Sequence, residues 1–284
     1  MKIVDLHTHS NISDGSYTPS EIIQQAHRVG IGAIALTDHD TIAGVSEAEK
    51  QAKNLGVGFL PGMEMSVNYN NRRLHIVALG FDRDHPEFQK VYKKIRKIKE
   101  AGVAKAVEKI RSAGIDIDMA MLKKNFTTTD NVDRYAIMRY FVSLNMFDNV
   151  QKIWDQYINP AFAEFNVNIT AEEGVAAVKA AGGITSLVHF HKKIGLGGMT
   201  RVEQENFIQA LLALGLDGME GYYPNYSEED QAFATYLIDK YKMLPTGGTD
   251  FHGKNRSNVV LGTGINDNMS VPYEWYQSIA NKCK

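Results

Sequence analysis

The stretch Asp5-Leu6-His7-Thr8-His9 follows a short apolar segment near the N-terminus and decides the interpretation of the rest of the chain. The pattern predicts a strand over Ile3–His7. Side chains two residues apart on a strand point to the same side, so His7 and His9 would present two imidazoles to one space. Imidazole is a common ligand of Zn, Mn and Fe ions. The stretch therefore predicts a strand whose end carries part of a metal site.

Further side chains that bind metals stand at or near the ends of other predicted strands. They are found in Thr37-Asp38-His39-Asp40, at Glu64 with the later His75, at His189 and Glu220, and in Thr249-Asp250-Phe251-His252. One such residue is commonly an ordinary polar group on a stable fold. Many such residues at the ends of different strands are poorly explained as ordinary polar groups, because buried imidazoles and carboxylates without partners cost stability. The pattern therefore favours a cluster of metal ions.

Apolar strands alternate with capped helices in the first 82 residues and again after about residue 169. Capping boxes at Thr18–Glu21 and Thr170–Glu173 mark two helix starts. This alternation predicts a parallel α/β barrel or sheet, and in a barrel the C-terminal strand ends meet on one face. Besides Ile3–His7, the predicted strands are Ala33–Thr37, Val57–Val67, Leu74–Phe81 after a hairpin turn at Asn70-Asn71, Ile184–His189, Gly218–Tyr222, Leu244–Thr249 and Val259–Leu261.

A stretch without strand signals separates the two alternating parts. Its predicted helices are Phe88–Ala113, Arg134–Leu144 and Val150–Tyr157. We therefore expect a helical insertion subdomain over residues 86–166 that forms part of the substrate pocket. The barrel domain would then be discontinuous, over residues 1–85 and 167–284.

Composition narrows the function classes. The 284 residues carry a formal net charge of −2, which argues against a broad face for long nucleic acid. The single cysteine, Cys283, allows no disulfide within the chain and makes a thiolate metal site implausible, so a reducing cytoplasm is the expected compartment. No signal peptide precedes the first strand, and no apolar run is long enough to cross a bilayer.

Four ordered motifs make the chain resemble the PHP (polymerase and histidinol phosphatase) family. They are Asp5–Ser10 with Ser13-Asp14-Gly15, Leu36–Asp40, Gly62-Met63-Glu64, and Gly248–Gly253. The resemblance covers about residues 2–82 and 170–264. It implies a distorted (β/α)7 TIM-like barrel with a site of two or three divalent ions, Mn, Fe or Zn. The insertion resembles that of small PHP phosphoesterases acting on nucleotides and sugar phosphates.

The resemblance also implies which residues bind each ion. His7 and His9 would hold one ion together with Glu64 and Asp250. Glu64 would bridge to a second ion held by His75 and His189. Asp5, Asp38 and Asp40 would orient the imidazoles from behind. The residues of the third ion would be Asp14, His39 and His252.

The segment His189-Phe190-His191-Lys192-Lys193 departs from the family, which usually places Pro after the His of this strand. By alignment His189 is the better ligand. His191 points to the same side, so it could replace His189 or contact the phosphate.

A phosphate ester repels hydroxide, and adjacent divalent ions neutralise that charge and lower the pKa of a bridging water to roughly 7. We therefore expect direct attack of a metal-bridging hydroxide on phosphorus. His191 is a candidate acid for the leaving oxygen. In similar phosphoesterases an arginine of the insertion reaches the substrate, which makes Arg134 a candidate for catalysis and substrate binding beside Lys192. Tyr222, Tyr223 and Tyr226 would wall a base or sugar pocket or simply pack.

The leading hypothesis is a phosphoesterase for a small phosphorylated ribose or nucleotide. Its branches are a 3',5'-bisphosphonucleotide phosphatase, a cyclic ribose-phosphate phosphodiesterase, and a 5'-3' exonuclease on short RNA. Histidinol phosphatase and a metal-binding PHP module without catalysis are alternatives. A C–N hydrolase of the amidohydrolase type also opens with His-x-His, but it commonly needs a carboxylated Lys, for which only the region of Lys192 fits. The oligomeric state stays open.

Overall fold

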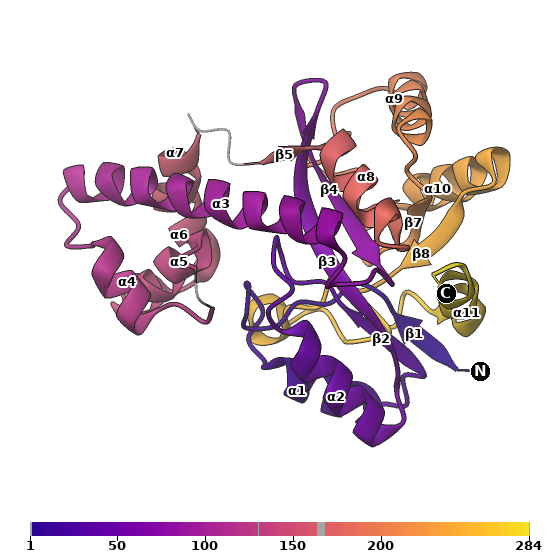
Figure 1. Cartoon of the computed structure of the whole chain (residues 1–284), viewed down its shortest axis with the longest axis horizontal. Helices are drawn as coiled ribbons and strands as arrows, with labels where there is room; N and C mark the ends of the chain where they lie inside the picture. Colours follow the sequence, from indigo (N-terminus) through magenta and orange to yellow (C-terminus); the bar gives the residue numbers. More distant parts are fainter. Residues whose placement is uncertain (1, 130, 164–167, 284) are drawn as a thin grey trace. The chain divides into compact units, whose positions relative to one another are not determined.

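The computed structural model describes residues 2–129, 131–163 and 168–283 (Figure 1). The chain forms two compact units, one made of the residues up to Val91 and from Ile169 onward, the other of Tyr92–Asn168. The predicted end of the insertion at residue 166 lies outside the described residues. That the insertion forms part of the substrate pocket stays a prediction. Within the described ranges, no helix combines the length and the apolar character needed to cross a membrane.

The first unit is built on one mixed sheet, in the order β8-β7-β6-β4-β3-β2-β1-β9, with β5 beside β3. Its members are β1 (Ile3–Asp5), β2 (Ala33–Leu36), β3 (Gly58–Tyr69), β4 (Arg72–Leu79), β5 (Ile169–Thr170), β6 (Ile184–Leu187), β7 (Gly218–Tyr222), β8 (Leu244–Gly247) and β9 (Val271–Pro272). Figure 1 shows β3 and β4 as its longest strands. The predicted strand at Val259–Leu261 is wrong: Val260 makes only an isolated bridge to Gly264, and β9 pairs with β1 instead.

The sheet curves until its first and last parallel strands meet. The backbone amide of Leu6 donates to the carbonyl of Gly247 at 3.0 Å, and that of His9 donates to Phe251 at 2.9 Å. Thr8 and Phe251 form a parallel bridge just beyond β1 and β8. These bonds nearly close the sheet into a barrel, which confirms the predicted distorted TIM-like fold.

β4 departs from the parallel pattern, because it runs antiparallel to both β3 and β6. The predicted hairpin turn at Asn70-Asn71 is confirmed: both residues adopt a positive φ, 45° and 60°, as the tightest hairpin turns require. The reversal places His75 near the start of β4, paired with Ser66 near the end of β3. His75 thus faces the edge at which the neighbouring parallel strands end.

Two helices of this unit begin at the capping boxes predicted above. Thr18 and Thr170 form complete capping boxes, as do Thr200 and Ser227. α1 and α2 lie side by side (Figure 1), and Ile22, Ile23 and Ala26 of α1 share a buried cluster with β2. The bounds are α1 (Pro19–Arg28), α2 (Val45–Leu55), α8 (Ala171–Ala180), α9 (Arg201–Ala213), α10 (Glu228–Tyr241) and α11 (Tyr273–Lys282), the last of which was not anticipated.

The second unit is helical and has a core of its own. α3 (Pro86–Ser112) runs into it from the first unit, and α4 (Met119–Asn125), α5 (Arg134–Ser143), α6 (Val150–Ile153) and α7 (Asn159–Phe162) follow, with a π-helical turn at Trp154–Ile158 between the last two. Val103, Ile110, Ile137, Phe141 and Ile158 are buried together. α4 was not anticipated from the sequence.

Candidate metal centre

Glu64 of β3 lies at the centre of the predicted ligands and is fully buried. Its Oε2 is 3.3 Å from His7 Nε2, 3.2 Å from His9 Nε2 and 3.0 Å from His39 Nδ1. Its Oε1 is 2.7 Å from His75 Nδ1 and 2.8 Å from His189 Nε2. One carboxylate therefore faces five imidazoles from four separate parts of the sheet edge.

The ligating atoms form three overlapping groups, each with its atoms within 4.8 Å of one another. The groups are His7, His9, Glu64 and Asp250; His39, Glu64 and His75; and His9, Asp14, His39 and His252. They resemble the predicted partition, with His189 added to the second by its contact with Glu64. The structure differs from the predicted partition because His9 and His39 each belong to two groups. The three candidate sites therefore share ligands with one another.

Several buried polar atoms at this centre make no hydrogen bond to the described residues, although some of them lie within ion-pair distance of a carboxylate. They include Nε2 of His7, both ring nitrogens of His9, and Oε2 of Glu64. Buried polar atoms are costly unless something pairs with them. Nitrogen and carboxylate oxygen are also the donor set that Mn, Fe and Zn accept. The residues therefore fit a group of divalent cations.

The charges of the centre point the same way. Burial would lower the pKa of His9, but the carboxylates of Asp250 and Glu64 outweigh it and raise that pKa to about 10. The pKa of His7 is likewise raised well above its usual value, against burial, by Glu64 and Asp250. The pKa values of Glu64 and Asp250 lie well below normal despite burial, because cationic neighbours surround both. Protonated imidazoles thus balance the carboxylates in the metal-free protein.

This balance predicts that metal binding expels protons. With a pKa of about 10, His9 is protonated at pH 7–8, and an imidazole must be neutral to bind a metal. We expect Mn²⁺ binding to release about one proton or more at this pH, and the release from His9 to decline as the pH rises through 10. Titration calorimetry in buffers of different ionisation enthalpy measures the release.

His9→Ala should lower the proton release, and replacement of the exposed His27 by alanine should leave it unchanged. A binding heat that is the same in every buffer would contradict the raised pKa.

Glu220 of β7 orients two of the candidate ligands. Its Oε1 lies 3.1 Å from His7 Nδ1, and its Oε2 accepts from the backbone amide of His189 at 2.7 Å. The contact turns His7 Nε2 toward Glu64 and Asp250. A carboxylate behind a metal-binding imidazole is a common device for fixing the ring. The sequence placed Glu220 at a strand end but assigned it no role.

Asp5, Asp38 and Asp40 were expected to orient the imidazoles, and that role stays a prediction. The structure shows a further role for all three, in hydrogen bonds to the segments that carry the ligands. Asp5 accepts from the amide and hydroxyl of Thr249 and from the amide of Gly262. Asp38 accepts from the hydroxyls of Ser10 and Ser13, and Asp40 from the amide and hydroxyl of Ser66. These carboxylates hold the backbone segments that carry the ligands.

The backbone is strained at several of these positions. Asp250 has a φ of 53° and His189 a φ of 31°, a region that residues other than glycine rarely adopt. Such conformations cluster at functional sites because the surrounding structure must enforce them. Gly248 serves a related purpose: a Cβ there would lie 2.4 Å from the His7 amide nitrogen. Only glycine lets the end of β8 approach the strand that carries His7.

Three donors meet the outer oxygen of Asp250. Its Oδ2 accepts from the Tyr223 hydroxyl and Arg256 Nη1, each at 2.8 Å, and from Lys192 Nζ at 3.2 Å. Its Oδ1 lies 3.2 Å from His9 Nε2. Lys192 therefore lies beside a candidate metal ligand, and its contact with phosphate stays a prediction. Arg256 was missed, because it ends a short 3-10 helix (Gly253–Arg256) after the last motif, and only the folded chain brings it to Asp250.

His191 lies outside the three ligand groups. Its ring packs 5.1 Å from that of Tyr226 and 5.5 Å from that of Tyr223, whereas His189 contacts Glu64. Burial lowers the pKa of His191, and its roles as an acid or phosphate contact stay predictions. Tyr222 does not join this cluster: its ring stacks on that of Trp275 at 5.2 Å.

Arg134 is the first residue of α5 in the second unit. Asp133 caps the helix, and the guanidinium lies over the rings of Tyr135 and Trp154, at 5.1 and 5.3 Å. Its predicted contact with the substrate stays a prediction.

Comparison with known proteins places these features in a family context. Residues 5–172 match the PHP domain. A 5'-3' exoribonuclease of Haemophilus influenzae is 30% identical over 88% of this chain and 90% of its own length. A 3',5'-nucleoside bisphosphate phosphatase of Chromobacterium violaceum is 29% identical over 92% of this chain and 91% of its own.

A phosphoribosyl 1,2-cyclic phosphate 1,2-diphosphodiesterase of Eggerthella lenta is 26% identical over 89% of this chain and 95% of its own. Among solved structures, an amidohydrolase of Chromobacterium violaceum with bound sulfate and no metal aligns with a TM-score of 0.82 and 25% identity. The alignment covers 98% of this chain and 96% of that one.

Proposed function

The chain belongs to the PHP domain family, and on this basis we propose that it hydrolyses the phosphoester of a small phosphorylated ribose or nucleotide. The observation that carries the proposal is the set of three ligand groups joined at Glu64, His9 and His39. Related proteins of nearly full-length coverage are named as a bisphosphonucleotide phosphatase and a cyclic ribose-phosphate diphosphodiesterase.

We further propose two or three divalent ions, Mn, Fe or Zn, as the cofactor. The three overlapping groups supply a place for each ion. Bound there, such ions would neutralise the phosphate charge and activate water near neutral pH. The chain itself contributes the orientation of the ligands, through Glu220 behind His7 and through the loops fixed by Asp5.

The cationic side chains beside Asp250 suit the rest of the substrate. Lys192 and Arg256 already pair with Asp250 Oδ2, and either can exchange part of that contact for a phosphate oxygen. Arginine suits phosphate because its fork of donors matches two oxygens. The sulfate bound to the related amidohydrolase, an ion of phosphate's shape, supports a site for such oxyanions in proteins of this fold.

The alternatives differ in substrate more than in chemistry. Exonuclease activity on short RNA is favoured by the name of the Haemophilus influenzae relative. The net charge of −2 favours a small substrate over long RNA. Against C–N hydrolysis, Lys192 Nζ lies 3.2 Å from Asp250 Oδ2, whereas the amidohydrolase type commonly needs a carboxylated lysine. Histidinol phosphatase and a metal-binding module stay as alternatives, and the cytoplasmic location stays a prediction.

A phosphoester panel tests the function. Protein reconstituted with Mn, Zn or Fe is given 3',5'-bisphosphoadenosine, a ribose cyclic phosphate, histidinol phosphate, AMP and a short RNA, and phosphate and product release are measured. We expect strong turnover of one of the nucleotide or ribose substrates. His9→Ala and Asp250→Ala should abolish it, because both residues contribute to the ligand groups.

No turnover in any metal form, despite metal binding, would overturn the proposal for these substrates and favour the module. Turnover of histidinol phosphate alone would show that the protein is a histidinol phosphatase.

A further inference from the structure

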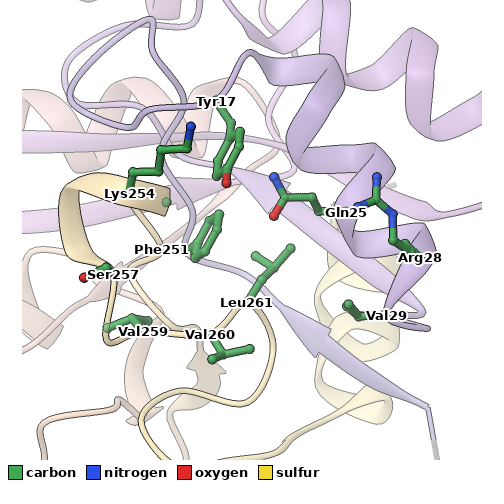
Figure 2. A pocket seen from close by; sticks show the side chains of 11 residues that line it. Tyr17, Gln25, Arg28, Val29, Phe251, Lys254, Ser257, Val259, Val260 and Leu261 are labelled. Carbon is green, nitrogen blue, oxygen red and sulfur yellow. The ribbon is translucent and has the colours of Figure 1, made fainter.

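A cavity of about 320 Å³ lies between the end of α1 and the segment after β8 (Figure 2). It shares no lining residue with the three candidate ligand groups. Small-molecule sites in proteins typically span roughly 300–1,000 Å³. The cavity therefore has room for a ligand of about mononucleotide size.

Aromatic and aliphatic side chains form one part of its wall. The rings of Tyr17 and Phe251 are parallel, with an interplanar angle of 2° and centroids 6.2 Å apart, and Figure 2 shows both beside the cavity. Phe251 is buried, whereas Val29 and Val260 at the rim are 56% and 52% exposed. Covering exposed aliphatic side chains with a flat apolar group is favourable, because it removes apolar surface from water.

Cationic and amide groups complete the wall. Arg28 and Lys254 line the cavity, and among the described residues neither side chain has a hydrogen bond or salt bridge. The carboxylate of Glu21 interacts electrostatically with Lys254. That carboxylate is already engaged in the capping box with Thr18. Gln25 adds an amide that can donate and accept. The cavity thus offers two cations to an anionic group and an aromatic wall to a planar one.

We propose that this cavity binds a nucleoside monophosphate, as a ligand site distinct from the metal centre. The base would lie against the part-exposed ring of Tyr17, which itself packs on the buried ring of Phe251, since aromatic side chains hold nucleobases by stacking. The phosphate would pair with Arg28 or Lys254, whose side chains form no hydrogen bond or salt bridge with the described residues. The inference does not depend on the proposed hydrolysis, because the cavity is built from other side chains.

The position of the cavity connects it to the ligand-bearing loops. Phe251 stands between Asp250 and His252 in the chain. The Lys254 amide donates to Ser16 Oγ at 2.8 Å, and Asn255 Nδ2 donates to the Asp14 carbonyl at 2.7 Å. A ligand in the cavity would therefore contact the same backbone segment that carries two candidate metal ligands.

Valine-methyl NMR of the full-length, metal-loaded protein locates binding directly. The signals of Val29 and Val260 are assigned from Val29→Ile and Val260→Ile, and AMP is titrated. We expect saturable shifts of both signals, with adenosine and inorganic phosphate each binding about tenfold more weakly or worse than AMP. The shifts should persist in His9→Ala, which separates the cavity from AMP bound at the metal centre.

Charge reversal tests the recognition. Arg28→Glu and Lys254→Glu together should weaken AMP at this site by at least about tenfold. Arg73→Glu, at an exposed arginine away from the cavity, should bind like the parent protein. The proposal is overturned by unchanged Val29 and Val260 signals under saturating AMP, by adenosine binding as tightly as AMP, or by a double charge reversal without effect.

Discussion

Replacement of Glu64 by glutamine is expected to reduce kcat/KM by about 1,000-fold or more and to remove at least one bound ion. The substitution keeps the size of the side chain but removes the charge that faces five imidazoles, among them His7, His9 and His75. If Glu64 helps to hold the divalent ions, its loss would remove part of the charge stabilisation that such ions supply, which is worth several kcal/mol, and about 4 kcal/mol corresponds to a thousandfold.

Elemental analysis of the purified variant and phosphate release on its best substrate measure the two effects. Glu172→Gln is the matched control, because Glu172 is exposed on α8 and should keep both properties. If Glu64→Gln retained its full metal content and rate, the three ligand groups could not be joined through this residue. A thermal unfolding curve separates loss of metal from failure to fold.

Replacement of Glu220 by glutamine is expected to weaken Mn²⁺ binding or turnover by about 10- to 100-fold, the usual cost of losing a carboxylate behind a metal-binding histidine. Glutamine can still accept from the His189 amide, but it no longer stabilises the proton that His7 Nδ1 shares with the carboxylate at 3.1 Å. His7 would then hold its Nε2 less firmly toward Glu64.

Because Glu220 is fully buried, a purely structural role must be distinguished. The Mn²⁺ affinity of Glu220→Gln, measured by calorimetry, and its melting temperature are compared with those of Glu229→Gln. Glu229 is an exposed residue of α10. We expect the affinity to fall while most of the metal-free stability remains. A lower melting temperature with unchanged Mn²⁺ affinity would assign Glu220 to folding alone.

Local features of the fold were predictable from the sequence because neighbouring residues determine them. The capping boxes at Thr18 and Thr170 begin helices as expected, and Asn70-Asn71 forms the predicted hairpin. The predictions were wrong where pairing with a segment distant in the sequence determines whether a strand forms. Val259–Leu261 has strand-forming residues but no continuous partner strand, whereas β9 is a strand because β1 offers it an edge.

The sequence by itself determined the family and the candidate ligands, because each motif couples a strand end to a fixed spacing of imidazoles and carboxylates. His7 with His9 and Asp250 with His252 are such pairs. Alignment favoured His189 over His191 as the ligand, and only the fold shows that His189 contacts Glu64 while His191 packs against tyrosine rings.

Tertiary structure alone decided how the candidate sites join and what surrounds them. His9 and His39 each belong to two ligand groups, and Tyr223, Lys192 and Arg256 converge on one oxygen of Asp250. The physical reason is range: strand and helix patterns depend on residues within a few positions of one another. These contacts depend on barrel closure and the reversal of β4, which bring together residues remote along the chain.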